Sequence, residues 1–164
     1  MMISKAMNAK LNEQIAAEFY AAHKYLAMAC AFDRMGLKIL ASRFLKQHEE
    51  ERGHGMKILK YVQEVGGTVA LDAVAKPAKD YKSTEAIVSA ALESELEITA
   101  KINDIMALAD SEKDYATRSF LQWFVDEQVG EVSQMTDLLN VVKMAGENLL
   151  QVEARVRHEM LGEK

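Results

Sequence analysis

Apolar residues recur at alternating steps of four and three along four long stretches of this sequence, and this periodicity constrains the fold more than any other feature. The spacing places the apolar side chains on one face of an α-helix, as in a helix that lines the core of a bundle. Pro77 is the only proline among 164 residues, so the periodic stretches lack the residue that breaks helices most strongly. We therefore predict an all-α four-helix bundle.

Serine and glycine residues mark the ends of the predicted helices. Ser4 and Ser83 are suitable N-caps, because a serine hydroxyl can accept a hydrogen bond from a free backbone amide. Gly36 and the pair Gly66-Gly67 interrupt the pattern, as helix-ending glycines do. The predicted helices run from Ser4 to about residue 35, over 37–65, from Ser83 to about 109, over 115–144 and, as a short amphipathic tail, over 148–160, all within one domain, 1–164.

The segment 68–82 has no clear helical period and separates the second predicted helix from the third. Connections of about 15 residues are unusual within compact domains. A connector that must run the length of a bundle is one reason for such a segment. We therefore predict two antiparallel helix hairpins joined by a long crossover.

Each of the four apolar seams is interrupted near its midpoint by polar side chains of the kinds that bind metals. The midpoints of antiparallel helices lie at one level, so these side chains should converge at one place in the core. They are Glu18 on the first helix, Glu51 and His54 on the second, Glu95 on the third, and Gln128 and Glu131 on the fourth.

A cluster of four carboxylates and one histidine needs additional positive charge, because a buried and unpaired carboxylate costs several kcal/mol. A pair of divalent cations would supply that charge. Glu51 and His54 are three residues apart and so share a helix face, and Gln128 and Glu131 repeat the spacing. Ligation rich in carboxylates suits iron or manganese better than structural zinc.

Three motifs in this order resemble the ferritin family, and the resemblance covers nearly the whole chain. They are Leu11-Asn12-Glu13-Gln14 leading to Glu18, then His48-Glu49-Glu50-Glu51-Arg52-Gly53-His54, and Phe120-Leu121-Gln122-Trp123-Phe124-Val125-Asp126-Glu127-Gln128. The resemblance implies a ferritin-like bundle that oxidises Fe(II) with O₂ or H₂O₂ and stores the ferric product. It also implies a homo-oligomeric shell of twenty-four subunits, in which the short C-terminal helix lines a pore.

The resemblance assigns roles residue by residue. It implies that Glu18, Glu51 and His54 hold one iron, and that Glu51, Glu95 and Glu131 hold the other with Gln128 beside it. Glu51 would then bridge the two irons. Tyr25 matches a family tyrosine close to this centre, where it would donate a hydrogen bond or an electron; the alternative is a seam aromatic whose hydroxyl finds any partner. Trp123 also matches the family and serves packing alone in the simplest interpretation.

A third iron site is expected to be weak, absent or completed by water. Many bacterial ferritins carry such a site beside the iron pair, and Glu50 and Glu127 match two of its ligands. The position of a further glutamate holds Gly130, which offers no side chain. Haem is not expected, because bacterioferritins bind it through a methionine where this chain has Arg52, and their second Glu-x-x-His pair is here Gln128 and Glu131.

The remaining features separate this chain from other classes. A net charge of −5 disfavours nucleic acid as a partner. No apolar run is long enough to span a membrane, and no signal segment is apparent at the start of the sequence. Cys30 is the only cysteine, so no intrachain disulfide is expected. We therefore expect a cytoplasmic protein. The single cysteine also excludes the cysteine-ligated iron domain of rubrerythrins.

Three alternatives stay open at this point. They are a bacterioferritin-like protein, a di-iron oxygenase acting on an organic substrate, and a non-catalytic bundle whose polar cluster only fixes helix register. His23, His48 and His158 lack partners at ligand spacing and are expected at the surface. The tail helix would bury Leu149, Leu150, Val152, Val156 and Met160, either at a pore or as a cap on the bundle.

Overall fold

The computed structural model describes residues 2–162, so the predicted span 1–164 extends beyond the described residues at both ends. The described residues contain five helices and no strand, which confirms the all-α prediction. None of these helices is long and apolar enough to cross a membrane. The helices are α1 (Lys5–Arg34), α2 (Lys38–Glu64), α3 (Thr84–Glu112), α4 (Tyr115–Ala145) and α5 (Leu149–Leu161).

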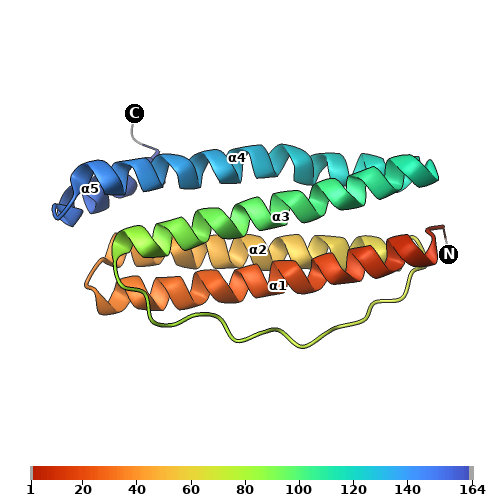
Figure 1. The fold of residues 1–164 in the computed structure, drawn as a ribbon, viewed down its shortest axis with the longest axis horizontal. Helices are drawn as coiled ribbons and strands as arrows, with labels where there is room; N and C mark the ends of the chain where they lie inside the picture. Colours follow the sequence, from red (N-terminus) through yellow and green to blue (C-terminus); the bar gives the residue numbers. More distant parts are fainter. Residues whose placement is uncertain (1, 163–164) are drawn as a thin grey trace.

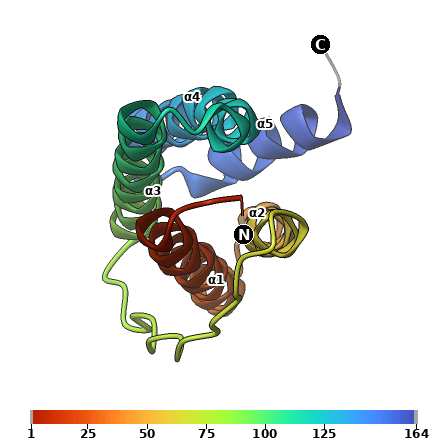
Figure 2. The same ribbon diagram turned by 90° about the vertical axis from the view of Figure 1, so that its right-hand side faces the viewer.

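Two antiparallel hairpins, α1–α2 and α3–α4, lie side by side and form the bundle (Figure 1). The crossover runs along the outside of α1 from one end of the bundle to the other (Figures 1 and 2). Its first residues are bound to α1, where Asn12 donates to the Thr68 carbonyl at 2.9 Å and accepts from the Ala70 amide at 2.7 Å. Near its far end, Arg34 donates to the Lys79 carbonyl. The crossover is therefore fixed to α1 at both ends.

Three of the long helices begin with a cap from the preceding residue. The side chains of Ser4, Ser83 and Asp114 accept hydrogen bonds from backbone amides in the first turns of α1, α3 and α4. Helix α2 has no such cap, because it follows Leu37. Its free amides are satisfied from the other end of the chain by Glu153 of α5.

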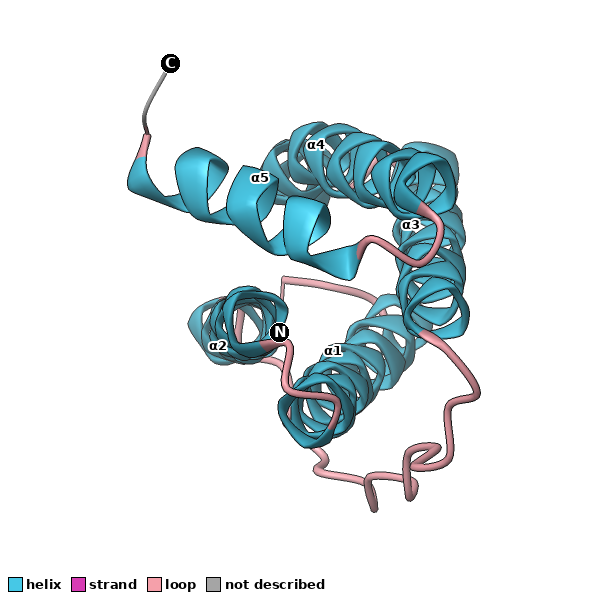
Figure 3. Ribbon diagram, turned by 90° about the vertical axis from the view of Figure 1, so that its left-hand side faces the viewer, coloured by secondary structure: helices cyan, strands magenta, loops and turns pink. Residues whose placement is uncertain are grey.

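Helix α5 crosses the end of the bundle between α2 and α4 (Figure 3). The Glu153 carboxylate accepts hydrogen bonds from the amides of Ile39 at 3.1 Å and Leu40 at 2.7 Å. One turn further along α2, Arg43 donates to Glu159 at 3.0 Å. These contacts join the last helix to the start of the second.

The core consists of two apolar clusters separated by one polar layer. On α1, for example, Leu11 and Ile15 belong to one cluster and Tyr25 and Phe32 to the other. Glu18 lies between them in sequence, and the polar residues of α2, α3 and α4 likewise lie between members of the two clusters. The polar layer therefore lies at one level of the bundle, as the matched helix midpoints predict, and its buried members include Glu18, Glu51, His54, Glu95, Gln128 and Glu131.

The structure corrects three details of the sequence prediction. Helix α3 continues to Glu112, beyond the predicted end at 109, and stops where Lys113 adopts a left-handed backbone with φ of 55°. On α5, Val152 and Val156 are buried but Leu150 is 78% exposed, because only one narrow face of the helix meets α2 and α4. Met160 is likewise exposed, and Leu149 is half-buried.

The histidines expected at the surface divide into two groups. His23 and His158 are exposed. His48 is half-buried, with its Nδ1 2.8 Å from the Ala22 carbonyl oxygen of α1. It therefore helps to join the first hairpin and is not simply a surface residue.

Candidate metal centre

The first hairpin supplies a compact set of three candidate ligands. Glu18 of α1 and Glu51 and His54 of α2 each offer a ligand atom, and these atoms all lie within 4.8 Å of one another. The two glutamates are fully buried and His54 is 6% exposed. The His54 Nδ1 lies 3.3 Å from a Glu51 carboxylate oxygen, as the spacing of three on one helix face requires. Three atoms at such separations can share one cation.

The second hairpin supplies three further polar side chains, Glu95, Gln128 and Glu131, of which Glu131 is joined to the first set by an amide group. The Gln47 amide donates to Glu51 at 3.1 Å and to Glu131 at 2.7 Å, and so connects α2 with α4. The Gln128 amide donates to a Glu95 carboxylate oxygen at 3.3 Å and so connects α4 with α3. All six residues predicted to form the iron pair therefore lie in one buried cluster.

Tyr25 donates a hydrogen bond from its hydroxyl to the Glu95 carboxylate. The ring is fully buried and also packs against Phe44, with ring centroids 5.5 Å apart. The partner of this hydroxyl is thus one of the predicted ligand carboxylates. Burial and the negative charge of Glu95 raise the pKa of Tyr25 well above 10, so the hydroxyl keeps its proton and remains the donor.

Burial and mutual repulsion raise the pKa values of the carboxyl groups. Burial raises the pKa of Glu131 to about 7 and that of Glu95 to about 8, with repulsion from Glu51 adding to each. The same two causes raise the pKa of Glu18 well above 4.5. Burial lowers the pKa of His54, but the hydrogen bond and attraction of Glu51 outweigh it and raise the value to about 9. Without a cation, the cluster therefore retains protons near neutral pH.

One carboxylate oxygen in the cluster is left without a partner. Glu18 accepts a hydrogen bond at 2.8 Å from Gln14 through one oxygen, but its second oxygen is buried and has no hydrogen-bond partner. An unsatisfied buried oxygen of this kind costs about 1–3 kcal/mol. The oxygen lies on the residue that joins Glu51 and His54 in the compact set. A bound cation would satisfy it, so the donor set fits a metal.

Gln14 and Gln47 are the functional residues that sequence reasoning missed. Each donates its amide to the glutamate four residues later on the same helix, Glu18 and Glu51 respectively. The signal was present in the sequence, since a glutamine at position i−4 from a buried ligand shares its face. The link from Gln47 to Glu131 on another helix could not be read from that spacing.

Comparison with known proteins identifies the family. The model of the ferritin-like domain family matches residues 8–145. Bacterial non-heme ferritins of Staphylococcus aureus and Staphylococcus epidermidis are 37% identical to this chain over 147 residues, which cover 90% of this chain and 89% of each relative. The chain belongs to the ferritin family.

Solved ferritin structures have the same architecture. An open-pore ferritin from the hyperthermophilic archaeon Archaeoglobus fulgidus is 39% identical and superposes with a TM-score of 0.92, covering 94% of this chain and 96% of that one. A closed form engineered from the same ferritin gives a TM-score of 0.91. At the level of the family, ferritins oxidise and store iron as oligomers. The ferritin-like bundle predicted from the sequence is confirmed.

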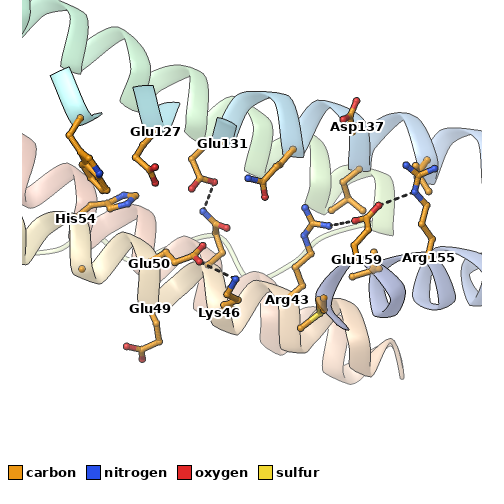
Figure 4. Close-up of a pocket in the computed structure, with 18 of the residues that line it drawn as sticks. Arg43, Lys46, Glu49, Glu50, His54, Glu127, Glu131, Asp137, Arg155 and Glu159 are labelled. Carbon is orange, nitrogen blue, oxygen red and sulfur yellow. Dashed lines mark hydrogen bonds and ion pairs between the residues drawn. The ribbon is translucent and has the colours of Figure 1, made fainter. Parts of the chain in front are cut away.

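Beside this buried cluster, a groove of about 790 Å³ opens between α2 and α4, and α5 contributes to its lining. Figure 4 shows Glu50, Glu127, Glu131 and His54 facing one another across it. Glu50 and Glu127 are only half-buried, unlike the residues of the central cluster, and Glu50 pairs with Lys46 at 3.3 Å. The two predicted ligands of a third iron therefore lie on the solvent side of the centre, where Gly130 contributes no side chain.

Trp123 covers His54 from the side of this groove. The two rings meet edge-on, with centroids 5.5 Å apart. The Lys57 ammonium lies 3.3 Å from the centroid of the indole ring, which is a cation–π arrangement. Trp123 therefore packs directly against a candidate ligand, His54, at the wall of this groove.

Two glycines, Gly53 and Gly55, flank His54 in the sequence, and a side chain at each position would meet different surroundings. A Cβ at Gly55 would lie 2.8 Å from the Phe19 ring, so glycine is required for α1 and α2 to approach each other at the level of the centre. A Cβ at Gly53 would meet nothing within 4 Å. Gly55 thus leaves room for the Phe19 ring where α1 packs against α2.

Proposed function

We propose that this protein is an iron-storage ferritin that oxidises Fe(II) at a two-iron site within each subunit. The observation that carries the proposal is the unpartnered oxygen of Glu18 within a buried set of four carboxyl groups and one imidazole. Such a set is unstable as an ionised cluster without cations. Iron is here the substrate, and the protein supplies the place where two ions and one oxidant meet.

In this proposal, one Fe(II) binds to Glu18, Glu51 and His54, and the second to Glu51, Glu95 and Glu131. The bridging role of Glu51 is supported by its position, because its charge acts on Glu18, Glu95 and Glu131 alike. Gln128 lies beside the second ion and, being neutral, holds it less firmly than a carboxylate would. Weaker binding on that side allows the ferric product to leave.

The reaction balances as two one-electron oxidations. Two Fe(II) ions give up one electron each, and O₂ takes both electrons with two protons to form H₂O₂. With H₂O₂ as the oxidant, the same two electrons and two protons yield two water molecules. Protons that the carboxyl groups release when cations bind are available for either reaction. Tyr25 keeps Glu95 oriented through its hydrogen bond.

We further propose that the third iron site is weak or is completed by water. Glu50 and Glu127 face the groove, but Gly130 offers no further carboxylate beside them, and a Cβ at Gly130 would have only Gln134 nearby, at 3.9 Å. The variant Gly130→Glu should therefore be accommodated and should add one iron to the fast phase of oxidation. An iron-soaked crystal of the unmodified protein with a fully occupied, protein-ligated third site at Glu50 and Glu127 would refute this part.

The subunits assemble into a closed shell of twenty-four in this proposal. The two most exposed apolar side chains near the C-terminal end of the bundle, Met144 and Leu150, support a contact with neighbouring subunits there. Native mass spectrometry measures the assembly directly. A monomer or dimer at micromolar protein concentration would contradict the proposed shell. Helix α5 would then serve only as a cap on the bundle of its own subunit.

The decisive experiment is rapid mixing of metal-free protein, loaded anaerobically with Fe(II), against O₂. We expect a fast phase of about two irons per chain, as the paired site requires. A value near three would show that the accessory site works despite Gly130. The absence of a fast phase would favour a structural bundle or an oxygenase that awaits its substrate.

A further inference from the structure

The centre is reached from two sides by grooves of opposite chemistry. The groove between α2 and α4 reaches His54 and Glu131 and is lined by many charged side chains, as Figure 4 shows. A second groove of about 460 Å³ lies between α3 and α4, and its inner wall includes Gln128. The two grooves share no lining residue. The proposed iron site therefore lies between the charged groove, which runs between α2 and α4, and the uncharged groove, which runs between α3 and α4.

The lining of the α3–α4 groove is uncharged throughout and mostly apolar. Ile102 and Gln128 form its buried inner part, and Val129 stands at the outer rim with 71% of its surface exposed. Its polar members are neutral amides and hydroxyls. Its walls include Leu96, Thr99 and Ile102 of α3 and Val125, Val129 and Val132 of α4.

Gln128 separates this groove from the carboxylates of the centre. Its amide donates to Thr99 at 3.1 Å, to the Glu95 backbone carbonyl at 3.2 Å and to a Glu95 carboxylate oxygen at 3.3 Å. One side chain thus lines the groove and contacts a candidate iron ligand. A molecule that passes along the groove to Gln128 has reached the edge of the centre.

We propose that the α3–α4 groove is the route by which dioxygen reaches the iron pair, with Gln128 as its inner boundary. Dioxygen is small, neutral and apolar, so it gains by leaving water for an apolar surface. Hydrated Fe(II) loses its favourable hydration in such a groove, whereas the carboxylates of the α2–α4 groove attract it. This inference rests on the proposed function and deepens it by giving the two substrates separate paths.

The neutral amide of Gln128 is consistent with this division. A carboxylate at that position would place a negative charge at the inner end of the apolar groove and would draw cations and water into it. The amide keeps the wall uncharged while it fixes Glu95 through the backbone and the side chain. We therefore regard Gln128 as a positioning residue for the oxidant path as well as a neighbour of the second iron.

The first test fills the groove in the assembled, full-length protein. Val132→Phe adds an aromatic ring within the groove, and Val129→Trp covers its rim at a position exposed enough to tolerate a large side chain. Tyr115→Trp is the matched control, because Tyr115 is 68% exposed on the same helix and lies outside both grooves. The readout is the dependence of the fast oxidation rate on oxidant concentration, measured with O₂ and separately with H₂O₂.

We expect both groove variants to lower the second-order rate constant for O₂ by about tenfold, with anaerobic Fe(II) binding unchanged. The rate with H₂O₂, which is polar and travels with water, should change little, and the control should match the unmodified protein. An unchanged rate with O₂, or an equal loss with both oxidants, overturns the proposal.

The second test does not depend on iron oxidation. Xenon occupies apolar sites of about the size that suits dioxygen. Crystals of the unmodified protein under xenon pressure should show xenon between Ile102 and Val129, and crystals of Val132→Phe should not. Failure of the proposed function would appear as the absence of a fast phase with either oxidant. Failure of the groove proposal would appear as xenon elsewhere in the protein or nowhere.

Discussion

The two hairpins contribute to the centre in different ways. The α1–α2 hairpin brings Glu18, Glu51 and His54 into a compact group, and Gly55 allows the two helices to approach closely beside them. The α3–α4 hairpin contributes Glu95 and Glu131, which are connected to the first hairpin by hydrogen bonds from Tyr25 and Gln47 respectively. One half of the site is therefore a compact group of ligands, and the other is more open, because it also borders the groove between α3 and α4.

This difference indicates a division of labour between the two halves. A rigid, buried group of ligands binds an ion firmly, because little ordering is needed when the ion arrives. A side that opens to grooves and includes a neutral amide allows ions and oxidant to exchange. We therefore expect the first iron to bind on the α1–α2 side and the second, weaker iron on the α3–α4 side.

The largest effect is expected where the two halves meet. Glu51→Ala removes the group shared by both proposed iron positions, so the fast phase of Fe(II) oxidation should be lost almost completely in stopped-flow absorbance measurements. Glu64→Ala on the same helix is the matched control, because Glu64 is exposed and only pairs with Lys60. An initial rate in Glu51→Ala equal to that of the control would contradict the assigned site.

The next effect separates the two halves directly. Glu18→Gln should abolish the tighter of two binding steps in anaerobic Fe(II) calorimetry, whereas Glu131→Gln should weaken only the second step. Both substitutions keep the shape of the side chain and remove its charge. Equal losses from the two variants would show that the halves bind iron alike and that the packing difference has no consequence for affinity.

The pH dependence of the metal-free protein tests the electrostatics of the whole cluster. Folding raises the pKa of Glu131 from 4.5 to about 7, that of Glu95 from 4.5 to about 8 and that of His54 from 6.5 to about 9. Each group then contributes its full stabilisation of the folded state at pH values below its ordinary pKa. That contribution is lost as the pH rises through the pKa of the group in the folded protein.

The melting temperature of the metal-free protein should therefore fall as pH rises from about 5 to about 9. Bound divalent cations compensate the carboxylates, so the metal-loaded protein should show a weaker decline over the same range. Differential scanning calorimetry across this range, with and without metal, measures both curves. A metal-free melting temperature that rises over this range would contradict the proposed protonation of the cluster.

The smallest effects concern the glycines beside His54. Gly55→Ala forces a Cβ against the Phe19 ring at 2.8 Å, and overpacking of this kind costs about 1–3 kcal/mol. Gly53→Ala meets open space and should stabilise the helix by up to about 1 kcal/mol. Urea unfolding gives both values. Equal changes in the two variants would show that Phe19 moves aside and that Gly55 does not set the spacing of α1 and α2.

Much of this arrangement was predictable because it follows from helical periodicity. The seam positions place Glu18, Glu51, Glu95 and Glu131 on inward faces, and antiparallel pairing places them at one level. The caps at Ser4 and Ser83 also follow from local sequence, and both are present in the structure. These features depend on spacing within one helix or on the length of neighbouring helices.

The features that the sequence did not predict depend on contacts between distant segments. The link from Gln47 to Glu131 spans two helices, and the acceptor for the first amides of α2 comes from Glu153 in α5. The exposure of Leu150 depends on the angle at which α5 crosses the bundle. The two grooves likewise arise from how helices diverge, which periodicity alone does not contain.

The contact between Glu153 and α2 has a consequence for the order in which the chain folds. Helix α2 leaves the ribosome long before residue 153 is made, so its first turn lacks its cap during most of synthesis. A helix start without a cap is less stable by about 1 kcal/mol. The cap on the first turn of α2 therefore forms only after Glu153 has been made, and α5 completes an element whose residues were synthesised much earlier.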